Sequence, residues 1–215
     1  MELVRIDTQR AYELIREKIT SLELAPGSPI DEGSLANELR MGLVPIREAL
    51  NLLAYDHLVA TADQGLFISK VEIPDLQQIS EIRMLLEPYC ARQAAIHATA
   101  DDIVVLEALS QEQGQIPQDQ PKQLFDLDHK FHQAIARAAK NTYLAEILEN
   151  FYGHSKRVWF LVLPHLDFLS AAVESHLDMV QAIKTRDAER ASQMMQAHVQ
   201  SFYEKVFEIL KTKSE

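Results

Sequence analysis

From Pro74 onward the chain carries no strand signal, and this change of character restricts the fold more than any other feature of the sequence. Apolar residues in this region recur at the three- and four-residue spacing of amphipathic helices. Prolines, Asn141 and short polar links, among them a break at Pro164, divide the region into six expected helices. These span roughly residues 74–98, 101–113, 121–140, 142–163, 167–185 and 187–212. The pattern predicts an all-α helical bundle.

The first 70 or so residues have a different pattern. Helices are expected over residues 8–22, over 31–39 and from Pro45 to Tyr55, since proline suits a first helical position. Two short strands, 58–61 and 66–69, flank the turn Ala62-Asp63-Gln64-Gly65. Three helices followed by a β-hairpin predict a winged helix-turn-helix. We therefore expect a mainly α protein of two domains, 1–72 and 73–215.

Composition sets limits on the cellular setting and on the partners. The chain has 215 residues, of which 47% are apolar, and its single cysteine, Cys90, allows no internal disulfide. The start, MELVRIDTQR, lacks the apolar segment of a secretory signal, and no apolar run reaches membrane-spanning length. These features predict a soluble cytoplasmic protein with no membrane partner. The formal charge of −11 argues against strong phosphate binding, which requires cations.

Four residues of the helical region form a candidate metal site. Asp128 and His132 are one helical turn apart and share a face. His176 and His198 lie equally far from Asp187, one before it and one after it, in two consecutive helices. If these helices fold back on each other, the two imidazoles lie at the same height. Three imidazoles and a carboxylate at one level of a bundle predict a divalent-metal site.

A hydrogen-bonded polar cluster is the alternative interpretation of these four residues. Burying each group without a partner would cost about 1–3 kcal/mol or more, and one cation would satisfy all four. The ligands would be nitrogen and oxygen only, which leaves Zn, Ni and Mn open as the divalent ion. Such an ion would keep positions for water or a carboxylate, or it would serve only to hold the helices together.

The sequence resembles the GntR superfamily of bacterial transcription regulators. In the first region the resemblance rests on Pro26-Gly27, on Leu58-Val59 and on the run Pro45-Ile46-Arg47-Glu48-Ala49-Leu50. The second region is similar to the helical effector (FCD-type) domain of the FadR branch. The segments EIRMLLEPYCARQAA from Glu81 and DHKFHQAIARAAKNTYL from Asp128 carry that similarity. The motifs stand in the expected order over nearly the whole chain.

The resemblance implies a homodimeric regulator, most often a repressor, that binds double-stranded operator DNA and responds to a small carboxylic acid. It also implies a metal held by Asp128, His132, His176 and His198, the same four residues that the spacing selects. Arg83 falls on the apolar face of its helix, together with Ile79, Ile82, Leu86, Tyr89 and Cys90. It pairs either with Glu87 four residues later or, as the resemblance suggests, with the carboxylate of the effector.

The expected DNA-reading segment departs from the family pattern. Where related proteins carry Ser-Arg-Thr before the proline, this chain has Gly42-Leu43-Val44, so an arginine expected to read a base is missing. Residues 1–70 hold seven Lys or Arg against eleven Asp or Glu. We expect DNA contacts from Arg40 and Arg47, and from the backbone around Val44-Pro45 and Gly65 in the wing.

Two other functions remain open from the sequence. A metal-dependent enzyme is the first, because an open coordination position can activate water or polarise a carbonyl. No nucleophile–base pair stands beside the four residues, which makes the regulator the preferred hypothesis and an enzyme the lesser one. The second is a sensor or interaction protein whose DNA-binding head has degenerated, and only the substitution at residues 42–44 supports it.

Overall fold

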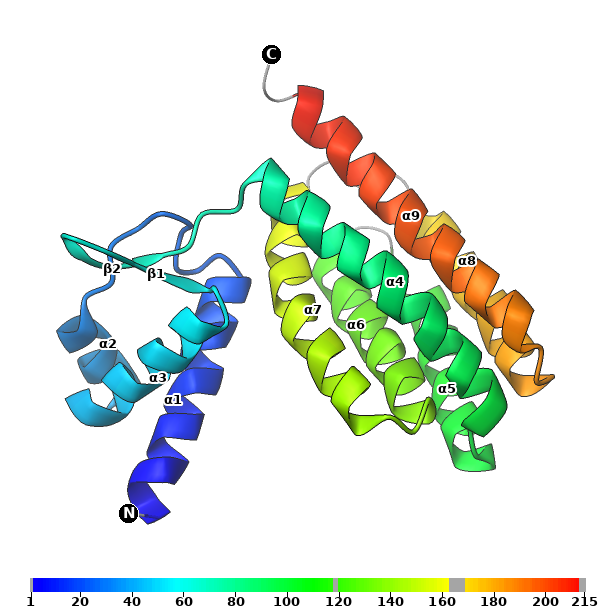
Figure 1. Ribbon diagram of the computed structural model, residues 1–215, viewed down its shortest axis with the longest axis horizontal. Helices are drawn as coiled ribbons and strands as arrows, with labels where there is room; N and C mark the ends of the chain where they lie inside the picture. Colours follow the sequence, from blue (N-terminus) through cyan, green and yellow to red (C-terminus); the bar gives the residue numbers. More distant parts are fainter. Residues whose placement is uncertain (1, 118–119, 163–168, 213–215) are drawn as a thin grey trace. The chain divides into compact units, whose positions relative to one another are not determined.

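The computed structural model of the chain describes residues 2–117, 120–162 and 169–212. It divides into two compact units, Met1–Glu72 and Ile73–Glu215, each considered by itself below (Figure 1). Among these residues helices dominate both units and one β-hairpin follows the third helix, so the expected fold class is confirmed. None of the described helices has the length and apolar character needed to cross a membrane.

The first unit is a winged helix-turn-helix. A core of aliphatic side chains from all three helices and the hairpin, including Ile15, Ile46 and Leu50, is fully buried. Its second helix begins where the Asp31 carboxylate accepts a hydrogen bond from the Ser34 amide at 2.9 Å. In order, the elements are α1 (Glu2–Thr20), α2 (Glu32–Leu39), α3 (Leu43–Tyr55), β1 (Val59–Ala62) and β2 (Gly65–Ile68).

The bounds of several elements in this unit correct the sequence-based expectation, beginning with α1, which runs from Glu2 to Thr20 instead of over 8–22. Helix α3 begins at Leu43, two residues before Pro45, because a proline in the first turn lacks only an amide that has no helical partner there. The strands are each shifted by one residue, so that Ala62 pairs with Gly65 and only Asp63-Gln64 form the turn. Gly65 has a φ of +120°, a conformation that favours glycine.

The second unit contains six helices within its described residues, arranged as a bundle in Figure 1. Helix α4 packs along α9 and also contacts α6 and α7, while α5 packs against α6 and α8. The predicted break at Pro164 and the expected start of a helix at residue 167 lie outside the described residues. The elements are α4 (Ile73–His97), α5 (Ala100–Gln115), α6 (Pro121–Ala138), α7 (Thr142–Val162), α8 (Leu169–Lys184) and α9 (Ala188–Thr212).

The turn between α8 and α9 fixes the register of these two antiparallel helices. Arg186 adopts a left-handed φ of 63°, and its guanidinium donates to the carbonyl oxygens of Ala95 (3.1 Å) and Ala98 (2.7 Å). The turn is therefore attached to the C-terminal end of α4. This attachment sets the heights of His176 on α8 and His198 on α9 within the bundle.

Candidate functional site

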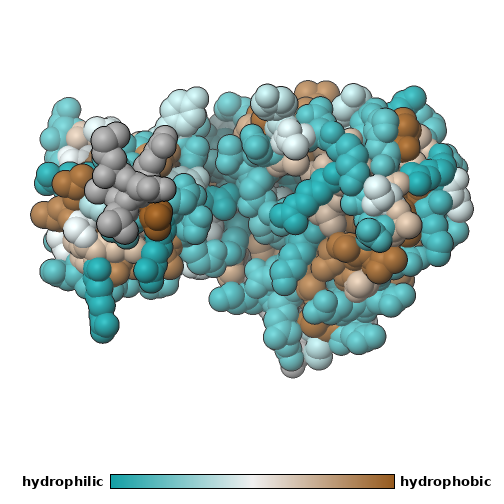
Figure 2. Space-filling view, turned by 90° about the horizontal axis from the view of Figure 1, so that it is seen from below, coloured by the Kyte–Doolittle hydropathy of each residue, from teal (hydrophilic) through white to brown (hydrophobic). Residues whose placement is uncertain are grey.

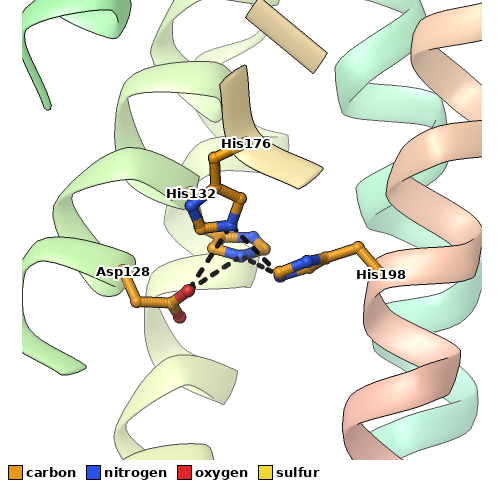
Figure 3. A group of neighbouring side chains, drawn as sticks. All are labelled: Asp128, His132, His176 and His198. Carbon is orange, nitrogen blue, oxygen red and sulfur yellow. Dashed lines mark hydrogen bonds and ion pairs between the residues drawn. The ribbon is translucent and has the colours of Figure 1, made fainter. Parts of the chain in front are cut away.

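The structure brings Asp128, His132, His176 and His198 together inside the helical unit (Figure 3). One ligand atom from each residue lies within 4.8 Å of all the others. Nε2 of His198 is 3.2 Å from Nε2 of His132 and 3.3 Å from Nε2 of His176. Oδ1 of Asp128 lies 3.5 Å from Nε2 of His176 and 3.8 Å from Nε2 of His132. Three ring nitrogens and a carboxylate oxygen thus surround one point.

The outward-facing nitrogens of two of these rings meet acceptor atoms. Nδ1 of His132 is 2.6 Å from Oε2 of Glu87 on α4, and Nδ1 of His176 is 2.6 Å from Oε1 of Gln113 on α5. A ring nitrogen that faces an acceptor carries the proton, so in a neutral ring the opposite nitrogen keeps its lone pair. In His176 this directs the Nε2 lone pair into the cluster, and His132 adds a second lone pair when its ring is neutral.

The remaining two members of the cluster are also held from outside. Nδ1 of His198 is 2.9 Å from Oγ of Ser175, and the Tyr152 hydroxyl donates to Oδ2 of Asp128 at 2.6 Å. The Tyr152 bond leaves Oδ1 of Asp128 facing the rings. Outer contacts of this kind fix the orientation of ligands in protein metal sites.

The pKa shifts of the three imidazole rings show which of them are neutral. Burial lowers the pKa of His176 well below its usual value, and burial together with the charge on His132 lowers the pKa of His198 to about 4. Both rings are therefore neutral at pH 7. For His132 burial alone would lower the pKa, but the carboxylates of Glu87 and Asp128 raise it.

The donor set fits a divalent cation better than it fits internal hydrogen bonding. His198 can donate from Nε2 to only one neighbour at a time, which leaves another lone pair and Oδ1 of Asp128 facing the same point. Neutral imidazole and carboxylate are the ligands that Zn, Ni and Mn accept. Asp128 and His132 come from α6, His176 from α8 and His198 from α9, so one ion would link three helices.

Arg83 is buried next to the cluster and pairs with Glu87 on its own helix. The guanidinium also donates towards Oγ of Ser155 (3.2 Å) and the hydroxyl of Tyr203 (3.4 Å). Glu87 therefore connects Arg83 to His132 and from there to the candidate metal position. Tyr89, expected on the same inward face, is instead 50% exposed.

Several residues that complete this site were not singled out from the sequence. Glu87 was considered only as a partner of Arg83, although the sequence places it one turn away on the same helix. Gln113 on α5 and Tyr152 on α7 reach the cluster from helices that carry no candidate ligand, Ser175 precedes His176 on α8, and no local pattern marks any of the three.

A small cavity of about 20 Å³ lies beside His132, with Glu87, Cys90 and Tyr152 among its lining residues. An open groove between α6 and α7 shares Glu149 with this cavity. His129, the neighbour of Asp128 in the sequence, contacts Oε2 of Glu149 at 2.9 Å and stacks on Tyr152 with 4.0 Å between ring centroids.

The candidate DNA-contacting residues lie around α2, α3 and the hairpin. Arg40 ends α2 with a left-handed φ of 53°, and Arg40, Val44 and Gly65 are exposed. Arg47 is also exposed, and its Nε lies 2.6 Å from Oε2 of Glu32. Pro45 differs, because its ring is buried in the core side of α3.

Comparisons with known proteins agree with both units. Residues 7–67 match the family of bacterial regulatory proteins named gntR, and residues 78–201 match the FCD domain. The HTH-type transcriptional repressor RspR of Escherichia coli K12 is 28% identical over 209 residues, covering 96% of this chain and 92% of that protein. The Nta operon transcriptional regulator of Aminobacter aminovorans is 28% identical over 192 residues, covering 89% and 90% respectively.

Solved structures share the fold. The structure of Escherichia coli McbR/YncC superposes with a TM-score of 0.84 at 21% identity, covering 95% of this chain and 98% of that one. A GntR-type regulator from Rhodococcus sp. RHA1 gives a TM-score of 0.77 at 18% identity, covering 93% and 97%. The two family matches and the full-length relatives point to transcription regulation and not to an enzyme. The chain belongs to the GntR family of bacterial transcription regulators, in the group that carries a C-terminal FCD domain.

Proposed function

We propose that this regulator is a cytoplasmic, homodimeric repressor that binds operator DNA through residues 1–72 and senses a small carboxylic acid through residues 73–215. A divalent ion held by Asp128, His132, His176 and His198 would form part of the sensing site. The observation that carries the proposal is the convergence of three Nε2 atoms and one carboxylate oxygen, each oriented by an outer partner.

The metal would supply positive charge and open coordination positions for an effector carboxylate. Tyr152 and Glu87 would orient the ligands, and the Arg83 guanidinium would provide a second positive charge beside them. In the structure the Arg83 guanidinium already has a carboxylate partner, so an effector that reaches it must compete with Glu87. Exchange of that pair offers a route from effector binding to movement of α4, the helix that begins at Ile73.

The winged unit supports DNA binding by its fold and family, not by its charge. A coupling of about 1–3 kcal/mol between effector and DNA would change occupancy 5- to 150-fold. The direct test is a fluorescence-anisotropy titration with duplex from upstream of the gene and with scrambled duplex, at two salt concentrations. Sequence-dependent binding that a carboxylic acid changes supports the proposal. Equal binding to both duplexes, followed by failure to enrich any site from a random library, contradicts it.

Arg47→Ala should weaken operator binding by about 5- to 150-fold and leave the metal content unchanged, since a base or phosphate contact from an arginine contributes about 1–3 kcal/mol. Lys184→Ala is the matched control, because Lys184 is similarly exposed and also pairs with a glutamate, but lies on α8 of the helical unit. Anisotropy titration and metal analysis of both variants give the comparison. Normal operator binding by Arg47→Ala would show that α3 is not the reading helix.

A homodimer is supported by apolar side chains exposed on one face of α4. Leu85, Tyr89 and Ile96 are 74%, 50% and 50% exposed and recur at helical spacing. Much of the surface in Figure 2 is hydrophilic, with hydrophobic residues gathered in patches. Exposed apolar patches mark association surfaces, and a symmetric dimer is the commonest arrangement.

Leu85→Lys should weaken the dimer by about tenfold or more, because a lysine in an apolar interface loses its hydration. Leu177→Lys on α8, where the leucine is 48% exposed, is the control and should leave self-association unchanged. Sedimentation velocity over a concentration series measures both. An unaltered dimer in Leu85→Lys would remove α4 from the interface.

A further inference from the structure

The first turn of α3 presents apolar side chains to solvent. Leu43 is 46% exposed and Val44 is 58% exposed, while Pro45 and Ile46, which follow, are buried. None of these four side chains can donate or accept a hydrogen bond. Branched aliphatic groups are the side chains that the start of this helix offers to a partner.

The polar residues of the next turn are already engaged within the unit. Arg47 pairs with Glu32 at 2.6 Å, and the Glu48 carboxylate accepts a hydrogen bond from the Thr8 hydroxyl at 2.6 Å. These contacts draw both side chains towards α1 and α2. In the DNA-free structure the exposed apolar pair therefore stands alone at the tip of the helix, and Arg47 can contact DNA only by exchanging Glu32 for a phosphate or a base.

Recognition helices of helix-turn-helix proteins place their N-terminal residues against base edges in the major groove. Those edges carry hydrogen-bonding groups and one apolar group, the 5-methyl of thymine. An aliphatic side chain that contacts this methyl group buries apolar surface. Against guanine or cytosine the same side chain would displace water from polar atoms and offer them no hydrogen bond in return. Thymine is therefore the base that suits this helix start.

We infer that Leu43 and Val44 read thymine methyl groups, so that each operator half-site carries a T·A pair where α3 begins. The inference rests on the proposed operator binding and specifies its chemistry. It assigns to this chain a sequence preference that an arginine at the same place would not produce, since arginine pairs with the O6 and N7 acceptors of guanine.

The test uses the whole 215-residue chain, with a divalent ion supplied, and sites selected from a random duplex library. Each thymine of the selected half-site is replaced singly by deoxyuridine, which removes the methyl group and leaves base pairing intact. At one or two positions we expect about three- to fivefold weaker binding per methyl. In Leu43→Ala or Val44→Ala the thymine and deoxyuridine duplexes should bind almost equally well at that position. The loss should persist in Leu52→Ala, a matched control on the same helix with the same 46% exposure as Leu43.

The outcomes separate this inference from the proposed function. A deoxyuridine effect that disappears in Val44→Ala and persists in Leu52→Ala supports it. Specific binding with no deoxyuridine effect at any position, or selected G·C pairs where α3 docks, overturns the thymine inference and leaves operator binding intact. Failure to enrich any site overturns both.

Discussion

His198→Ala should abolish high-affinity divalent-metal binding and the thermal stabilisation that the metal provides. Removing a direct ligand is expected to reduce affinity by more than about 100-fold, since even outer partners of metal ligands change it 10- to 100-fold. At a metal concentration of about 100 Kd the wild type gains about 2.7 kcal/mol, or roughly 5–10 °C in Tm. His198 is the least buried of the four residues, so its removal disturbs the core least.

The measurement compares Tm and metal content after dialysis, each with and without chelator. His97→Ala is the control, because His97 is an exposed histidine at the end of α4 in the same unit. The control should behave as the wild type. For His198→Ala the Tm should be the same with and without chelator. A wild type that retains no ion and whose Tm is indifferent to zinc, nickel and manganese would leave the four residues as a hydrogen-bonded polar cluster.

The positions of the helices in the second unit could be predicted from the sequence because capping residues and prolines mark their ends. Thr99 and Asp102 form reciprocal caps at the start of α5, and Pro121 opens α6. The start of α3 could not be predicted, because a proline is compatible with any position of a first helical turn. That two-residue difference matters, since it places Leu43 and Val44 on the helix.

Spacing alone predicted that Asp128 lies level with His132 and that His176 lies level with His198, whereas the contact between the two pairs depends on how α6 packs beside α8 and α9. The outer partners did not follow from spacing. His176 meets Gln113 across a separation of 63 residues, and such a contact depends on which helix packs beside which. The same holds for Glu32, which lies in a different helix from Arg47 and nevertheless pairs with it.

Glu87→Ala should destabilise the helical unit by about 3–5 kcal/mol, the largest loss we expect from a single substitution. Glu87 lies between Arg83 and His132, and all three side chains are buried. Removing the carboxylate leaves the Arg83 guanidinium charged and without its counter-ion in the core. Denaturant unfolding of the metal-free protein measures the loss without a contribution from bound ion.

Two companion variants test this explanation against simple loss of packing. Glu107→Gln breaks an exposed pair with Lys184, and should cost no more than about 1 kcal/mol. The double variant Arg83→Met with Glu87→Leu removes both buried charges and should recover most of the stability lost in Glu87→Ala. If the double variant is no more stable than Glu87→Ala, the loss comes from the cavity and not from the unpaired charge.

The pH dependence provides a further criterion, for which Glu87→Gln preserves the side-chain size. Burial alone would raise the pKa of Glu87, but the charges of Arg83 and His132 lower it well below its usual value of 4.5. A carboxylate whose pKa is lowered by folding stabilises the protein above the unfolded pKa, and this contribution is lost as the pH falls. The difference in unfolding free energy between wild type and Glu87→Gln should therefore be full at pH 7 and shrink below pH 4.5. A difference that stayed constant across that range would mean that the ionised form of Glu87 contributes nothing to stability, and that the Arg83–Glu87–His132 chain is held by packing alone.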